Sequence, residues 1–256
     1  MMPIISLKDV SKSYDGHVVV ADFSLTVAAG EIVALLGQTG AGKSTILNMI
    51  MGQVAPSAGE VRVNDSDPRA DGDALRGFLA VSFQTDRLLP WRTAEQNVAL
   101  GMEYLHVPKQ DRLQRARDWL KRVKLSEIHH RKYPHQLSGG MRQRVSLARA
   151  MSINPELILL DESFSQLDHT TSKALRGDFV ALVRSLKKTC LLITHRIDDA
   201  IEMADRIIVL ASPAQLKLEL TVDQANRNPQ SLAHIRELIT GTLSESPEAE
   251  SDEAST

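Results

Sequence analysis

The most specific chemistry in the sequence lies in the stretch GQTGAGKST, from Gly37 to Thr45. Its three glycines let the backbone curl with the N–H groups pointing inward, and such a nest binds phosphate oxygens. Lys43 adds a positive charge for terminal phosphates, and the Ser44 hydroxyl is a ligand for Mg²⁺. The predicted nucleotide contacts are Gly37, Gln38, Thr39, Gly40, Ala41, Gly42, Lys43, Ser44 and Thr45.

Two adjacent acids, Asp161 and Glu162, end the apolar run at 157–160. Such a run predicts a buried strand, and neighbouring side chains of a strand point to opposite sides. The two acids are therefore able to serve different roles. We expect Asp161 to hold Mg²⁺ through its water shell and Glu162 to polarise a water for attack on the terminal phosphate.

Two further polar residues follow apolar runs, Gln84 after 78–83 and His195 after 190–194. In an open α/β sheet, ligand contacts gather at the carboxyl ends of parallel strands. We therefore expect both side chains at the same edge. His195, placed beside a terminal phosphate, would hydrogen-bond its oxygen and the attacking water together.

A second glycine-led helix start lies in LSGGMRQRVSLARAM, from Leu137 to Met151. Ser138 is a suitable N-cap, and Gly139 and Gly140 leave the first backbone N–H groups unobstructed for an anion. The chain has only one phosphate loop of the first type. The second start is therefore most useful if it closes over the nucleotide held by another copy of the chain.

The elements that must position these residues predict an α/β fold. The run at 32–36 and the pattern at 46–51 place the glycine loop between a strand and a helix. Strand patterns at 4–10 and 17–27 predict a small antiparallel sheet, with Tyr14 just before its turn. We expect a P-loop NTPase core with a RecA-like, mostly parallel sheet, an N-terminal antiparallel β subdomain, and an α-helical subdomain inserted at about 87–140.

The segment after residue 211 is predicted to lie outside this ATPase domain, which would span 1–211. Asn228 and Pro229 open an amphipathic helix through Ile239, and from Gly241 the sequence is polar and acidic. We expect 212–256 to comprise this helix and a disordered tail.

Composition limits the classes of function. The chain has 256 residues, is 43% hydrophobic and carries a formal net charge of -2, so it has no sign of a strongly basic nucleic-acid binder. Its one cysteine, Cys190, excludes an internal disulfide and agrees with a reducing compartment. We find no apolar run long enough to cross a bilayer and no secretion signal, and we expect a cytoplasmic protein.

Further motifs complete a set that spans about residues 4–211. They are LSGGMRQR at 137–144, LILLDE at 157–162 and SQLD at 165–168, with Gln84 before them and His195 after. In this set and order the chain resembles the ATP-binding subunit of an ABC transporter.

The resemblance implies ATP and Mg²⁺ as cofactors and a head-to-tail dimer of two copies that buries two nucleotides. It implies that Tyr14 stacks on adenine and that Glu162 is the general base. It also implies metal contacts and contacts to the partner's γ-phosphate, with Asp168 near the nucleotide. The implied metal contacts are Ser44, Gln84 and Asp161, and the implied cross-dimer contacts are Ser138, Gly139 and Gly140.

Two longer stretches, 83–100 and 193–210, are similar to the branch that energises bacterial import of nitrate, sulfonates, taurine and related small solutes. In that family the loop around Leu88 to Trp91 receives a coupling helix of the membrane permease. The resemblance implies a peripheral protein on the cytoplasmic face of the bacterial inner membrane. A solute-binding protein would be an indirect partner, and no nucleic acid is expected.

Some residues depart from the family pattern. Ser163 stands where a proline commonly follows the catalytic acid, which would leave Glu162 less constrained. Gln166 replaces a small residue, and Arg196 and Gln96 occupy positions that are often acidic. All the expected catalytic groups are present, so we expect activity.

Three alternatives remain beside an importer. A soluble ABC ATPase acting on DNA or the ribosome usually carries a long coiled-coil insertion, whereas the segment between Gln84 and Ser138 is short and lacks sustained heptads. A P-loop kinase or small GTPase would not explain LSGGMRQR. An exporter subunit is the third, although exporters often fuse their membrane helices to the ATPase.

Overall fold

The main sheet of the molecule has six strands, in the order β5-β6-β7-β3-β8-β9. The structure is a computed structural model that describes residues 3–165, 167–222 and 228–244. The first five strands in this order are parallel, and the last runs antiparallel to its neighbour. The strands are β3 (Ile32–Leu36), β5 (Leu79–Ser82), β6 (Leu157–Asp161), β7 (Thr189–Thr194), β8 (Arg206–Leu210) and β9 (Leu216–Thr221).

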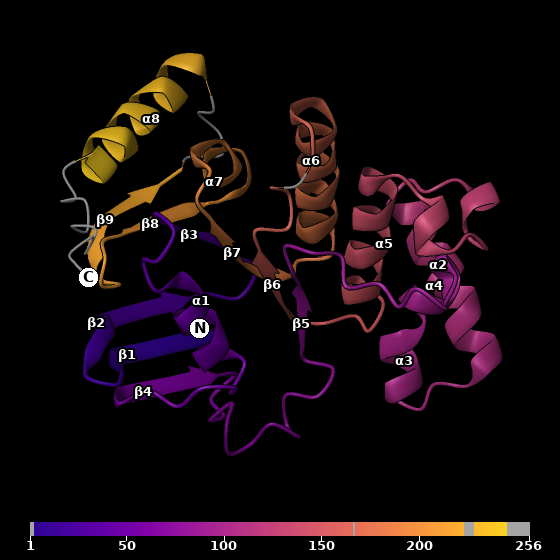
Figure 1. Ribbon diagram of the computed structural model, residues 1–256, viewed down its shortest axis with the longest axis horizontal. Helices are drawn as coiled ribbons and strands as arrows, with labels where there is room; N and C mark the ends of the chain where they lie inside the picture. Colours follow the sequence, from indigo (N-terminus) through magenta and orange to yellow (C-terminus); the bar gives the residue numbers. More distant parts are fainter. Residues whose placement is uncertain (1–2, 166, 223–227, 245–256) are drawn as a thin grey trace, which may run out of the picture.

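A second, antiparallel sheet lies beside the main one, in the order β2-β1-β4 (Figure 1). Its strands are β1 (Ile5–Tyr14), β2 (His17–Val27) and β4 (Ala58–Val63). β1 and β2 form a hairpin, because Asp15 and Gly16 both adopt positive φ angles and turn the chain tightly. The expected antiparallel β subdomain is therefore confirmed.

Helices cover the main sheet and form the insert. Figure 1 shows α2, α3, α4 and α5 grouped at one end of the molecule, beyond β5, with α8 at the opposite end above β9. The helices are α1 (Lys43–Ile50), α2 (Ala94–Val98), α3 (Leu100–Tyr104), α4 (Lys109–Arg122), α5 (Gly139–Met151), α6 (His169–Ser185), α7 (Ile197–Met203) and α8 (Pro229–Ser244), with the 3-10 turns η1 (Glu127–His129) and η2 (Pro134–Gln136).

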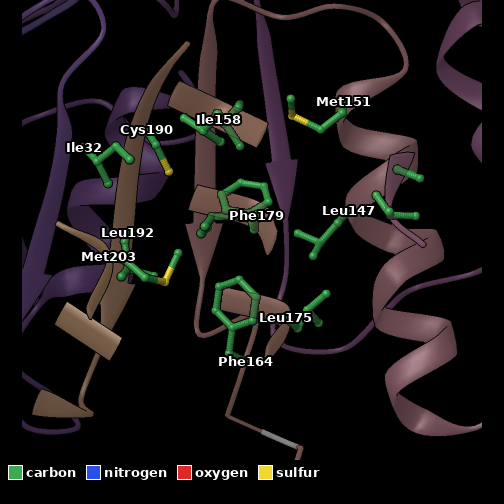
Figure 2. Packing of buried hydrophobic residues seen from close by; sticks show 14 of the residues in the cluster. Ile32, Leu147, Met151, Ile158, Phe164, Leu175, Phe179, Cys190, Leu192 and Met203 are labelled. Carbon is green, nitrogen blue, oxygen red and sulfur yellow. The ribbon is translucent and has the colours of Figure 1, made fainter. Parts of the chain in front are cut away.

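The central strands are apolar throughout because both faces of the sheet are covered. In β3, Val33 and Leu35 pack with α1 and the antiparallel sheet, whereas Ile32 and Leu36 pack toward the helices on the other face. Figure 2 shows the core between the main sheet and the helices on this other face, where Leu147 of α5 lies near Phe179. The continuous runs thus predict these strands correctly, and the two cores fix where their carboxyl ends meet.

Three elements differ from the sequence expectation. β9 pairs with β8, so the main sheet extends past residue 211. The sequence pattern at 173–186 predicts a helix, but α6 begins earlier, at His169, because Asp168 caps it. α8 continues to Ser244 and buries Ile235 and Ile239 in the helix-covered core. The disordered tail expected from Gly241 is therefore wrong as far as Ser244, because these residues continue α8. The rest of the expected tail, 245–256, and the predicted effect of Gln166 lie outside the described residues.

None of the helices in the described part of the chain is long and apolar enough to cross a membrane.

Candidate active site

The glycine loop joins β3 to α1, and its tight packing explains the glycines. Gly42 is the N-cap of α1 and has a φ of 77°, a left-handed conformation that residues with a side chain rarely adopt. A Cβ added to Gly42 would lie 2.6 Å from the carbonyl oxygen of Val19, and one added to Gly37 would lie 3.1 Å from that of Leu210. The loop is therefore pressed between the two sheets, with its backbone available on the outer side.

Lys43 is buried inside this loop, with only 5% of its surface exposed. Its Nζ donates hydrogen bonds to the carbonyl oxygens of Gly37 at 2.8 Å and Gln38 at 2.7 Å. Burial lowers the pKa of Lys43, while the nearby charges of Glu162 and Asp161 oppose this shift. The side chain thus holds a cation within reach of two carboxylates.

A hollow of about 290 Å³ opens over the loop. Its lining combines backbone N–H groups, hydroxyls, an ammonium and one carboxylate, which is a donor-rich surface suited to phosphate groups. It is small for a whole nucleotide, since pockets that enclose a drug-sized ligand have about 300–1,000 Å³. The residues that line it are Val19, Thr39, Gly40, Gly42, Lys43, Ser44, Thr45 and Glu162.

Glu162 and His195 come together at the carboxyl edge of the sheet, as the sequence predicts for parallel strands. The backbone N–H of Glu162 donates to the carbonyl oxygen of Ile193 at 2.9 Å, which ties the end of β6 to β7. Oε1 of Glu162 lies 3.0 Å from Nδ1 of His195. A carboxylate beside an imidazole and an ammonium is an arrangement able to move a proton next to a phosphate.

Ser163, which follows Glu162, is tied to the neighbouring strand. Its buried hydroxyl donates to the carbonyl oxygen of Ser82 at 2.8 Å, joining the chain after Glu162 to the end of β5. This bond constrains the chain at Ser163, and the expectation that Glu162 is less constrained than with a proline stays a prediction.

Asp161 is the last residue of β6 and is half-buried. Burial is the main cause that raises its pKa and Glu162 adds to it, whereas Arg87 and Lys43 act in the opposite direction. Among the residues that the structure describes, no group of three or more His, Cys, Asp or Glu side chains is placed to hold a metal ion. The single carboxylate and the Ser44 hydroxyl fit Mg²⁺, which is usually held by one or two carboxylates together with phosphate oxygens.

The other predicted residues lie around this centre. Gln84 is exposed just beyond the end of β5. Tyr14 ends β1 with 42% of its surface exposed and does not line the hollow. Asp168 is the N-cap of α6, and its Oδ1 accepts a hydrogen bond from the backbone N–H of Thr171 at 3.0 Å, which lowers the pKa of Asp168.

The second glycine-led helix start is not part of the hollow. Ser138 caps α5 by accepting a hydrogen bond from the backbone N–H of Met141 at 3.3 Å. Ser138 and Gly139 are exposed, and Gly140 is half-buried. Figure 1 places α5 well apart from α1. Within one chain, the two predicted phosphate-binding starts are therefore separate.

Two arginines of α5 that the sequence analysis did not single out clamp the loop after Gln84. Arg142 Nε donates to Oδ2 of Asp86 at 2.8 Å, and Arg149 donates to the carbonyl oxygens of Asp86 and Arg87, each at 2.7 Å. Their separation of about two helical turns puts both on one face, which is the signal in the sequence. These hydrogen bonds fix the position of the loop that follows Gln84 relative to α5.

Comparison with known proteins identifies the family. The sequence family described as "ABC transporter" matches residues 20–165. The chain is 40% identical over 210 residues to the putrescine transport ATP-binding protein PotG of Escherichia coli (strain K12), which covers 82% of this chain and 55% of PotG. It is 38% identical over 229 residues to the choline transport ATP-binding protein OpuBA of Bacillus subtilis (strain 168), covering 88% and 60%. The chain thus spans somewhat more than half the length of these relatives.

Solved structures agree with this assignment. A dimeric post-hydrolysis state of the ATP-binding cassette MJ0796 bound to ADP and Pi matches with a TM-score of 0.76 and 32% identity, over 85% of this chain and 98% of that chain. The cbiO1 protein of Clostridium perfringens, described as part of the ABC transporter complex cbiONQ, has the same fold with a TM-score of 0.80 at 24% identity, over 93% of this chain and 100% of that chain. The chain belongs to the ABC transporter family and has the cassette fold of its ATP-binding subunits.

Proposed function

We propose that the chain binds ATP with Mg²⁺ at Gly37–Thr45 and hydrolyses it, with Glu162 as the general base. The observation that carries the proposal is the Glu162 carboxylate, which lines the hollow over the glycine loop and lies 3.0 Å from the His195 imidazole. A base on the wall of a phosphate site is placed to accept a proton from an attacking water.

Each remaining polar group has a role in this proposal. The loop N–H groups and Lys43 bind the β- and γ-phosphates, and His195 orients Glu162 beside the γ-phosphate. Ser44, Asp161 and Gln84 would hold Mg²⁺, which when bound neutralises charge on the phosphate oxygens. Tyr14 stacks on the adenine, away from the residues that line the hollow.

The reaction is completed by a second copy of the chain. Ser138 and Gly139 are exposed at the start of α5, which lies apart from the chain's own glycine loop (Figure 1). A head-to-tail pair would bring this start to the γ-phosphate of the partner, with Asp168 at the shared surface. The dimeric state of MJ0796 supports such a pair in this family.

Replacing Glu162 with Gln tests the base assignment. Glu162→Gln removes the proton acceptor but keeps the shape, so kcat should fall by about 10²–10⁴-fold while ATP binding is retained. ATP should also hold the variant as a stable dimer, measured by light scattering. Glu156→Gln is the matched control, because Glu156 precedes the same strand at its opposite end and pairs with Lys188. If Glu162→Gln hydrolyses ATP at the parent rate, Glu162 is not the general base.

We also propose that a membrane permease docks beside Trp91. Leu88 is buried in the helix-covered core and is not available, which corrects the expectation for that residue, but Trp91 has 70% of its surface exposed. A hollow of about 330 Å³, lined by residues that include Arg92, Gln96 and Glu103, lies in the same subdomain. Trp is enriched among the residues that contribute most to protein–protein binding, so an exposed Trp91 is a suitable interface anchor.

A substitution at Trp91 tests this docking. Trp91→Ser should abolish co-purification with co-expressed permease subunits and leave nucleotide affinity unchanged. Ile128→Ser is the control, since Ile128 is equally exposed at 75% on η1. Loss of co-purification in both variants, or in neither, would argue against a specific role of Trp91.

The finer expectation of solute remains a proposal: an importer of a small solute such as nitrate, sulfonate or taurine. The relatives described above carry the names of putrescine and choline transport proteins, so they give this branch no support and add polyamines and choline to the solutes to test. Binding assays on the solute receptor encoded nearby, with all five classes of solute, decide between them. The proposed location is the cytoplasmic face of the inner membrane.

A further inference from the structure

A buried ionic cluster contacts the two loops that carry Glu162 and His195. Its centre is Arg176 of α6, a side chain with 1% of its surface exposed. The guanidinium forms ion pairs with Asp199 at 2.8 Å and Glu202 at 2.7 Å, both on α7. The cluster therefore joins α6 to the helix that begins two residues after His195.

The cluster also reaches the chain that follows Glu162. Arg176 donates to the Ser172 hydroxyl at 2.6 Å, and this hydroxyl donates to the carbonyl oxygen of Phe164 at 3.2 Å. The Phe164 ring is fully buried next to Phe179, as Figure 2 shows. One arginine is thus connected within two hydrogen bonds to a residue two positions from Glu162.

The cluster also contacts the two sequence neighbours of His195, which are Thr194 and Arg196. The Thr194 hydroxyl lies 3.4 Å from Oδ2 of Asp199 and accepts a hydrogen bond from the backbone N–H of Arg196 at 3.0 Å. The Arg196 guanidinium lies 3.8 Å from Asp199 and 3.4 Å from the carbonyl oxygen of Phe164. The cluster thus contacts the residues on both sides of His195, whose imidazole meets Glu162.

Stability alone is a poor reason for such a cluster. Taking charges out of water costs free energy that the ion pairs only partly offset, so an apolar replacement of equal volume is often as stable. The pKa of Asp199 shows this cost, because burial raises it although Arg176 and Arg196 act to lower it. Arg176 makes directional hydrogen bonds to Glu202 and Ser172, which fix α6 relative to α7 and to the chain after Glu162. The contact with Asp199 is an ion pair without a hydrogen bond to Asp199 Oδ1, so it holds Asp199 by charge alone.

We infer that Arg176 is a positioning residue, which through Asp199 and Ser172 holds the His195 imidazole against the Glu162 carboxylate. The inference rests on the proposed function for its effect on hydrolysis, but the placement of His195 does not depend on it. Arg176 itself does not line the hollow over the glycine loop.

The test compares Arg176→Met with Arg184→Met in the full chain. Both arginines belong to α6, and Arg184 pairs with Asp205 at 2.8 Å, away from the two loops. Arg176→Met should lower kcat about 10- to 100-fold with KM for ATP changed less than about twofold, since the glycine loop is intact. Arg184→Met should change neither. Arg176→Lys keeps one charge and serves if the methionine variant is poorly folded.

Two readouts separate positioning from a general loss of structure. In a His195→Ala background, Arg176→Met should cost less than about twofold in kcat, because residues that act as one unit are not additive. In NMR spectra of histidine-labelled protein, the His195 imidazole signal, assigned with His195→Ala, should shift in Arg176→Met and not in Arg184→Met. Equal losses in both backgrounds, or an unmoved His195 signal, overturn the inference. A parent chain without ATPase activity would instead sink the proposed function, and the NMR comparison would still decide the role of Arg176.

Discussion

The starts of α1 and α5 are both led by glycines, but they are built differently. α1 begins at Gly42 in a left-handed conformation without a side-chain cap, and its loop is pressed against Val19 and Leu210. α5 begins at Ser138, which caps it in the ordinary way, and a Cβ added to Gly139 would meet nothing closer than 3.8 Å. The start of α1 is enclosed by neighbouring residues and forms a hollow within one chain, whereas the start of α5 is an open surface.

This difference teaches which glycines shape a site and which keep a surface clear. Gly42 is required because no side chain fits there, so the chain makes its first site by itself. Gly139 is not required for the fold of the single chain, and a reason for small residues there has to come from something that approaches the helix. A second copy holding a nucleotide is such a group.

Of the substitutions that compare the two helix starts, the largest effect is expected from one that blocks the exposed start of α5. Ser138→Arg places a long side chain where the partner's phosphate would lie, so kcat should fall about 10²–10³-fold, as for a lost transition-state donor. The affinity of the single chain for a fluorescent ATP analogue should stay within about twofold of the parent, because the hollow is distant. Weakened nucleotide binding by the isolated variant would show that the two starts are not independent.

The next-largest effect is expected from a substitution at the start of α1, where the glycine loop forms the hollow. Lys43→Ala removes a buried ammonium that would bond charged phosphates, so affinity should fall about 100-fold, or about 3 kcal/mol. A titration with the fluorescent analogue measures this, with Lys173→Ala on the exposed side of α6 as control. Unchanged affinity in Lys43→Ala would remove the glycine loop as the nucleotide site.

The smallest effect compares the glycines themselves. Gly42→Ala should lower the free energy of unfolding by at least about 1–2 kcal/mol, the cost of the left-handed backbone alone, because its Cβ would also lie 2.6 Å from a backbone oxygen. Gly139→Ala should leave it unchanged or raise it by up to about 1 kcal/mol, since alanine is the better helix former. Urea denaturation of the two variants measures both values. Equal destabilisation would mean that Gly139 also shapes the fold.

Much of the site follows from local sequence signals. The glycine spacing predicts the loop between β3 and α1, and the apolar runs predict where β6 and β7 end, which brings Glu162 and His195 to one edge. Ser138 is predicted as a cap and is one. These signals are local because each depends on residues that are neighbours in sequence.

The features that the sequence did not reveal depend on distant partners. Arg176 lies on a helix among other polar residues and has no local sign that it is buried against α7. β9 alternates apolar and charged residues, but only its pairing with β8 distinguishes it from a linker. Leu88 resembles an exposed loop residue until the packing of α2 and α5 is known. Tertiary contacts decided each of these cases.

The backbone of Glu162 has a φ of 46°, in the region where a side chain costs roughly 1–2 kcal/mol and glycine costs little. A chain selected only for resistance to heat would gain by placing glycine at this position. It would then lose the carboxylate that meets His195. At position 162, a change that raises thermal stability would thus lower ATPase activity. Thermostable variants obtained without selection for activity should be checked first for substitutions at this position.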